Sequence, residues 1–168
     1  STPTDTLFPY TTLFRSVEEY VREMNLAAVK LARDLADEYT AKNPDKPRFV
    51  AGSVGPTNKT CSMSPDVNNP AYRALSYDEL AASYQQQMEA MLEGGVDAIL
   101  IETIFDTLNA KAAIFAAEQA MKMTGIEVPI MLSVTVSDIG GRTLSGQTLD
   151  AFLASVQHAN IFSVGLNC

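Results

Sequence analysis

Hydrophobic and polar positions follow two periods along this chain, which predicts helices and strands in regular succession. Helical spacing is clearest in a long amphipathic segment from Val17 to about Tyr39. It is also clear in a segment that begins with the capping-box pattern of Ser76 and Glu79 and stops at Gly94-Gly95. The expected buried stripe of the first helix consists of Val17, Val21, Met24, Ala28, Leu31, Leu35 and Tyr39.

Two further helices and four strands complete the pattern. Asp106 can cap a helix that ends before Gly125, and a short helix is expected from about Thr148 to His158. Strands are expected at 49–54, 98–101, 130–136 and 162–166. The run at 98–101 is almost continuously apolar, which is typical of a parallel strand that is covered on both faces.

The last three strands begin roughly thirty residues apart, which is the period of a β-α-β unit. The sequence therefore predicts an α/β fold with about four parallel strands and intervening helices. Four strands do not close a barrel. The fold is either a small open doubly wound sheet or a partial (β/α)8 TIM barrel.

The first sixteen residues are set apart from this pattern. The segment LFPYTTLFRS, residues 7–16, resembles the conceptual translation of a sequencing adapter and shares no periodicity with the helix predicted from Val17. We therefore treat 1–16 as an artefactual leader and 17–168 as one partial barrel domain.

Composition excludes several classes of function. The formal net charge is -8 and 46% of the 168 residues are hydrophobic, so the chain can bury a core and would repel nucleic acid. No apolar run approaches the ~20 residues that span a membrane, and no signal peptide is visible, so a cytoplasmic location is expected. Two cysteines, Cys61 and Cys168, make no disulfide framework and are expected to be free thiols or metal ligands.

Polar residues follow each predicted strand, where an α/β protein places its chemistry. They are Thr57 and Asn58 after the first strand, Glu102 and Thr103 after the second, Thr135, Ser137 and Asp138 after the third, and Asn167 and Cys168 after the fourth. A cysteine at such a position suits a reactive thiolate or a metal ligand. His158 has no partner for a catalytic triad, and no glycine-rich nucleotide fingerprint occurs.

From about Asn25 to Cys168 the chain resembles the homocysteine-binding domain of cobalamin-dependent methionine synthase. The matching segments are FVAGSVGPTNKT, SPDVNNPAYR, DAILIETIFDTLNAKAA, GRTLSGQT and GLNC. The resemblance implies a zinc-dependent (β/α)8 barrel, of which this chain carries roughly the third to sixth strands. It also implies that homocysteine, bound as a zinc thiolate, takes a methyl group from methylcobalamin to give methionine.

The resemblance assigns roles residue by residue. Cys168 matches the first of three zinc-binding cysteines, and the adjacent pair that completes the set lies beyond Cys168. Glu102 matches the glutamate that receives the substrate's ammonium group, and Asn167 anchors the loop or the amino-acid moiety. Thr57 and Asn58 lie at the same end of the predicted barrel, where the strands end, and are expected to contact substrate through backbone groups. Cys61 matches no zinc ligand of the family.

Two alternatives stay open from the sequence. One is a related zinc-dependent homocysteine methyltransferase that uses betaine or S-methylmethionine; GRTLSGQT favours the cobalamin type. The other is a truncated, non-functional fragment, which would be inactive by itself. In the cobalamin reading, the partners are homocysteine and the cobalamin and folate domains of the parent protein.

Overall fold

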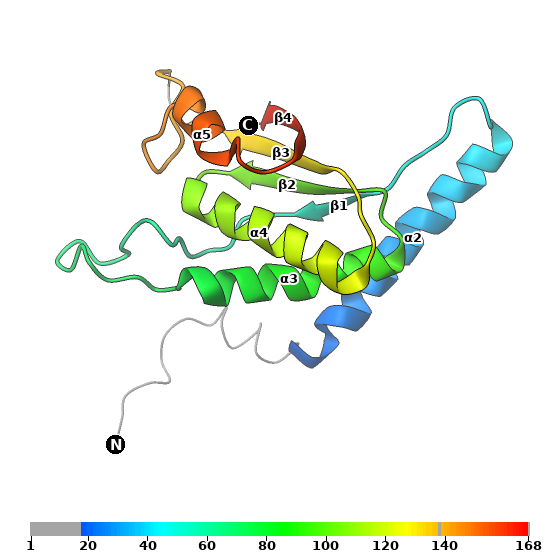
Figure 1. Ribbon diagram of the computed structural model, residues 1–168, viewed down its shortest axis with the longest axis horizontal. Coiled ribbons are helices and arrows are strands. Elements are labelled where there is room, and N and C mark those ends of the chain that lie inside the picture. Colours follow the sequence, from blue (N-terminus) through cyan, green and yellow to red (C-terminus); the bar gives the residue numbers. More distant parts are fainter. Residues whose placement is uncertain (1–17, 138, 168) are drawn as a thin grey trace.

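A computed structural model describes residues 18–137 and 139–167, in which helices and strands alternate (Figure 1). The helices are the 3-10 turn η1 (Glu18–Tyr20), α2 (Val21–Lys42), α3 (Tyr77–Gly94), α4 (Thr107–Thr124) and α5 (Leu149–Val156). The strands are β1 (Ala51–Val54), β2 (Ala98–Ile104), β3 (Ile130–Thr135) and β4 (Ile161–Asn167). The expected alternation of helix and strand is confirmed.

The strands form one parallel sheet in the order β1-β2-β3-β4. Each strand is therefore added beside its predecessor, always on the same side. A doubly wound sheet reverses its strand order at a switch point, whereas a (β/α)8 barrel does not. The observed order is that of part of a barrel and not of a small doubly wound sheet.

One face of the sheet carries the hydrophobic core. Helices α3 and α4 lie side by side against it (Figure 1). Ile99 and Ile101 of β2 and Leu132 and Val134 of β3 are all buried on this face. The helices contribute Leu80, Met88 and Leu92 from α3 and Ala112, Ala113, Ala116, Ala117 and Ala120 from α4, all of them buried. We call this side the covered face.

The alternate residues of the same strands form an open face. Ala51 and Ser53 of β1 are exposed, and Leu100 of β2 and Met131 of β3 are only half-buried. Strand 98–101 is therefore covered on one side only by the described residues, contrary to the expectation from its apolar run. In a (β/α)8 barrel this face is the interior, which side chains from all eight strands fill together.

Helix α2 corrects the predicted buried stripe. Met24, Leu31, Leu35 and Tyr39 are 58%, 74%, 55% and 50% exposed. Only Val29 and Ala36 are buried on this helix, and Val29 lies where a Cβ at Gly94 of α3 would come within 2.9 Å of it. Because Gly94 has no side chain, α3 can approach Val29 closely, and α2 packs against α3 at this point.

The predicted helix ends are confirmed by their hydrogen bonds. Ser76 and Glu79 form the capping box at the start of α3, and Gly95 ends that helix in the left-handed conformation. The Asp106 carboxylate accepts from the Leu108 and Asn109 backbone N–H groups at the start of α4.

Two remaining expectations concern the first strand and the leader. Phe49 precedes β1 and is 74% exposed, so the first strand begins at Ala51 and not at Phe49. The predicted leader, 1–16, lies outside the described residues. Within the described ranges, no helix combines the length and apolar character that a membrane crossing needs.

Candidate functional site

The carboxyl ends of the parallel strands lie along one edge of the sheet, and polar side chains meet there. Glu102 and Thr103 belong to the end of β2, Thr135 ends β3 and Asn167 ends β4. Hydrogen bonds join Thr103, Thr135 and Asn167, although the three residues come from different strands. The expected gathering of strand-end residues is therefore present for these strands.

Glu102 is half-buried on the open face and is held from the neighbouring strand. The Ser53 hydroxyl of β1 donates a hydrogen bond to Oε1 of Glu102. Oε2 of Glu102 accepts no hydrogen bond from any residue within 18–137 or 139–167. The carboxylate thus has one fixed oxygen and one that is available to a cationic ligand.

Glu102 and Thr103 are consecutive residues of strand β2, and a β-bulge places both of them on the same face of the sheet. Ile101 pairs with Leu132 and Ile104 pairs with Val134, so two residues of β2 stand opposite the single residue Ser133 of β3. Thr103 has a φ of 59°, which is unusual for a β-branched residue. Because of the extra residue, Ile104 returns to the covered face, where it is 5% exposed.

Asn167 bridges three strands through its side-chain amide. The Thr103 N–H can only donate and the Val134 carbonyl can only accept, which orients the amide. In this orientation Oδ1 of Asn167 accepts from the Thr103 N–H at 3.3 Å and from its hydroxyl at 3.1 Å. Its Nδ2 donates to the Thr135 hydroxyl at 2.7 Å and to the Val134 carbonyl at 3.3 Å.

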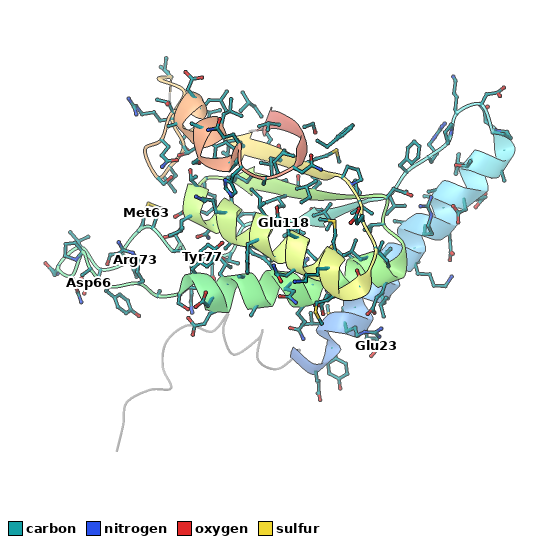
Figure 2. The ribbon with its side chains drawn as sticks, in the orientation of Figure 1. Glu23, Met63, Asp66, Arg73, Tyr77 and Glu118 are labelled. Carbon is teal, nitrogen blue, oxygen red and sulfur yellow. The ribbon has the colours of Figure 1, made fainter. Side chains whose placement is uncertain are left out.

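The long loop after β1, residues 55–76, extends beyond the carboxyl edge of the sheet, and Figure 2 labels Met63, Asp66 and Arg73 on it. Thr57 is half-buried and its hydroxyl donates to the Lys59 carbonyl at 2.7 Å, whereas Asn58 is exposed. Both predicted residues lie in the loop that follows the carboxyl end of β1.

Two residues at the start of α4 anchor this loop. Asn109 accepts from the Cys61 N–H at 2.8 Å and donates to the Lys59 carbonyl at 3.0 Å. Asp106, which is 2% exposed, accepts from the Ser62 hydroxyl as well as from the helix cap. The predicted cap thus has a second role, which is to hold the base of the loop.

The small pocket nearest this edge opens between the loop, β2 and the two helices. It has a volume of about 20 Å³, and its lining includes Gly55, Tyr84, Glu102 and Asn109. Such a space holds about one water molecule. The Tyr84 hydroxyl donates to the Gly55 carbonyl at 3.2 Å, and burial raises the pKa of Tyr84 to about 12. An amino-acid ligand would therefore lie on the open face and not in this pocket.

The family model of homocysteine S-methyltransferases matches residues 8–168. The chain belongs to the homocysteine S-methyltransferase family. Membership in this family confirms the broad part of the prediction, a resemblance to a homocysteine methyltransferase.

Solved structures of a family protein share the fold. The homocysteine methyltransferase MmuM from Escherichia coli in its apo form has a TM-score of 0.70 at 23% identity, over 90% of this chain and 51% of that chain. Its metallated form has a TM-score of 0.68 at 23% identity, over 88% of this chain and 49% of that one. Its oxidized form gives 0.68 at 24% identity, over 88% and 48%. The chain thus spans about half the length of these solved structures.

The described residues do not by themselves form a metal centre of the kind that the predicted zinc requires. Between residues 18 and 167, position 138 aside, no three His, Cys, Asp or Glu side chains cluster around a possible ion. The predicted ligand Cys168 lies outside the described residues. Cys61 is buried in the loop, and burial raises the pKa of its thiol above 9.0, which disfavours the thiolate that a metal would bind. His158 is exposed near the end of α5.

The sequence did not indicate two structural features of the candidate site. Ser53, which holds Glu102, was not singled out because it lies inside an apolar strand and the pairing depends on strand register. Ser53 is a polar residue on the open face of β1, two residues after Ala51. Its pairing with Glu102 can be recognised only once the register of β1 against β2 is known. The bulge at Thr103 had no signal, because no glycine marks the positive φ.

Proposed function

We propose that this chain supplies the homocysteine-binding part of a methyltransferase, with Glu102 receiving the ammonium group of homocysteine. The observation that carries the proposal is the geometry of Glu102. Its carboxylate stands half-buried on the open face, with one oxygen fixed by Ser53 and the other without a hydrogen bond from the described residues.

This geometry suits an amino-acid substrate for two reasons. A partly desolvated carboxylate forms a stronger, charge-assisted hydrogen bond to an ammonium group than an exposed carboxylate does. The bond from Ser53 also limits rotation of the Glu102 side chain, so the substrate is bound in one orientation. Thr57 and Asn58 lie at the same edge, and we propose that backbone groups of their loop contact the rest of the amino acid.

We further propose that Cys168 is one ligand of a zinc ion, completed by ligands outside residues 1–168. Support comes from the GLNC segment and from the existence of a metallated form of the MmuM homocysteine methyltransferase. When bound, zinc holds a thiol as its thiolate near neutral pH, which is the nucleophilic form.

For the methyl donor we propose methylcobalamin, presented by another domain of a cobalamin-dependent methionine synthase in the cytoplasm. The segment GRTLSGQT supports this choice over betaine or S-methylmethionine. Folate and cobalamin domains would be the partners. Because the chain spans about half of its solved relatives, we expect the 168 residues alone to be inactive.

The test of Glu102 uses a barrel completed with the remaining half, as in the solved relatives. Glu102→Gln keeps the size and the acceptor for Ser53 but removes the charge. We expect homocysteine binding, measured by calorimetry, to weaken by about 1.5–3 kcal/mol, the usual value for a hydrogen bond to a charged group.

Glu118→Gln is the matched control, because Glu118 is exposed on α4, away from the strand ends (Figure 2). It should leave homocysteine affinity unchanged. If Glu102→Gln binds as tightly as the parent, Glu102 does not hold the ammonium group. If the variant instead loses bound metal, its role is structural.

The test of the zinc ligand compares the two cysteines in the same completed barrel. Cys168→Ala should abolish stoichiometric zinc and methyl transfer, whereas Cys61→Ala should retain both. The reason is that tetrahedral zinc needs about four ligands, so the loss of one thiolate leaves the ion weakly held. Elemental analysis of the purified variants decides the matter. Full zinc retention in Cys168→Ala would show that the ligand assignment is wrong.

A further inference from the structure

We propose that Asn167 is a positioning residue for Glu102, acting through the β-bulge at Thr103. The inference rests on the proposed function of Glu102 as the ammonium-binding group. It assigns to Asn167 a role that precedes any contact with substrate, which is to hold the strand conformation that directs Glu102 to the open face.

The bulge explains how the open face obtains two consecutive side chains. In a regular strand successive side chains alternate between faces, so residues 102 and 103 would point to opposite sides. Here Ile101 and Ile104 are both buried on the covered face, at 3% and 5% exposure. Glu102 and Thr103 lie between these two residues in the strand. Glu102 contacts Ser53, and Thr103 contacts Asn167. The extra residue is what allows this arrangement.

The bulge needs a partner because it breaks the ladder between β2 and β3. A bulged residue leaves a backbone N–H without its usual acceptor, and an unpaired buried N–H is unfavourable. Oδ1 of Asn167 lies 3.3 Å from the Thr103 nitrogen and accepts this hydrogen bond from β4, beyond the intervening strand. The same oxygen accepts from the Thr103 hydroxyl at 3.1 Å.

Thr103 also adopts a backbone conformation that its side chain disfavours. A β-branched residue at a φ of 59° is strained and persists only when the surroundings hold it. Asn167 is itself fixed by Thr135 and Val134 of β3, which sit between it and β2 in the sheet. The three strand ends therefore form one hydrogen-bonded unit, and Glu102 is attached to it through a single peptide bond.

The first experiment measures the unit directly in the 168-residue chain, without homocysteine. Asn167→Ala should speed hydrogen exchange of the Thr103 N–H by about tenfold, the loss expected for one hydrogen bond. It should also shift the NMR signal of the Glu102 carboxylate carbon. The control is Ser163→Ala, because Ser163 lies on the same face of β4, pairs with Met131 and is exposed. That variant should leave both signals in place.

Asn167→Asp covers the case in which the alanine variant does not fold. The aspartate keeps an acceptor for the Thr103 N–H but cannot donate to Thr135 or Val134. Thr103 should then remain protected, and the Thr135 hydroxyl can turn to donate to the aspartate, whereas the hydrogen bond to the Val134 carbonyl is lost. Unchanged Thr103 exchange and an unchanged Glu102 signal in the alanine variant would overturn the proposal, as would loss of Thr103 protection in the aspartate variant.

The second experiment tests the link to function by rescue. Glycine adopts a positive φ without strain, so Thr103→Gly should keep the bulge without help from Asn167. In the completed barrel, Asn167→Ala should weaken homocysteine binding by about tenfold, the loss expected when a positioning hydrogen bond is removed. The double variant with Thr103→Gly should recover most of that affinity.

The outcomes separate this proposal from the one on which it rests. If exchange and carboxylate signals change as expected but the unaltered barrel does not bind homocysteine, the proposed function fails and the positioning role stands. If the barrel binds homocysteine and Thr103→Gly does not rescue Asn167→Ala, the positioning role is wrong. A general loss of β4 structure would show no rescue either, and so would count against it.

Discussion

The covered and open faces of this sheet are built from the same strands, yet they differ in what they contain. On the covered face, Ile99, Leu132 and Val134 are at most 1% exposed beneath α3 and α4. On the open face, the alternate residues include Ser53 and Glu102, which bond to each other and remain partly accessible. Alternation along a strand thus separates stability from chemistry within one element.

Because of this difference, we expect substitutions on the two faces to change different properties of the protein. Removal of a buried methyl group from the covered face leaves a cavity in a close-packed layer, which lowers the free energy of unfolding. Removal of a similar group from the open face leaves no comparable cavity, because the helices among the described residues cover only the other side. A change on the open face should instead alter ligand binding.

The largest effect should come from two neighbouring residues of β3 that point to opposite faces. Leu132→Ala should lower the free energy of unfolding by about 2–5 kcal/mol, the usual loss for a buried leucine. Met131→Ala, at a half-buried position on the open face, should cost well under half of that. Urea unfolding followed by circular dichroism measures both. Equal losses would show that the open face is packed as tightly as the covered one.

A smaller effect should appear at the outer layer of the covered side, where α2 meets α3. A Cβ on Gly94 would lie 2.9 Å from both Cβ and Cγ1 of Val29. Overpacking of this kind costs about 1–3 kcal/mol, and the better helix propensity of alanine offsets about 0.5–1 kcal/mol. Gly94→Ala should therefore lose about 1 kcal/mol in unfolding experiments.

The Gly94 prediction has an internal control. In a background that carries Val29→Ala, the Cγ1 atom of Val29 is absent, and Gly94→Ala should then cost less than in the parent. A constant cost in both backgrounds would mean that the two helices do not approach as closely as these distances state.

These comparisons also mark what the sequence could predict. Helix ends were predictable because capping is local: Ser76 with Glu79, and Asp106, act within four residues of the helix start. The alternation of helices and strands was predictable from period alone. Family membership was predictable from long strings such as DAILIETIFDTLNAKAA.

What failed depends on tertiary packing. In the stripe predicted to be buried on α2, Met24, Leu31, Leu35 and Tyr39 are at least half exposed, whereas Val17 lies outside the described residues. The helix instead meets α3 where Val29 faces Gly94, which has no side chain. In α4, the large side chains of Phe115 and Met123 are 45% and 70% exposed, while alanines make the core. Periodicity identifies a helix but not which of two apolar faces packs.

The sequence predicted some residues of the candidate site but not the contacts between them, because those contacts depend on strand pairing. Glu102 and Asn167 were found because strand ends can be read along the chain. Their partners Ser53 and Thr103 depend on the register of β1 against β2 and on an extra residue in β2. Neither register nor a bulge without glycine leaves a local signal.

At neutral pH an effect no larger than that of Gly94→Ala is expected from Tyr84, which joins helix α3 to the loop after β1. From α3 on the covered side, its hydroxyl reaches the Gly55 carbonyl just after β1. Burial raises the pKa of Tyr84 from 10.0 to about 12. Between these two pH values the folded state keeps a proton that the unfolded state loses. Stability should therefore fall as pH rises above 10, by at most about 1.4 kcal/mol per pH unit.

Tyr84→Phe separates this titration from the rest of the alkaline response. The variant loses one hydrogen bond, about 1 kcal/mol at neutral pH, and should then show a flatter decline above pH 10. Some decline should remain, because burial also raises the pKa of Cys61 and of Tyr77, which act with the same sign. Unfolding curves at several alkaline pH values test this directly. A parallel decline in both proteins would place the alkaline sensitivity elsewhere and remove Tyr84 as the link between α3 and the loop after β1.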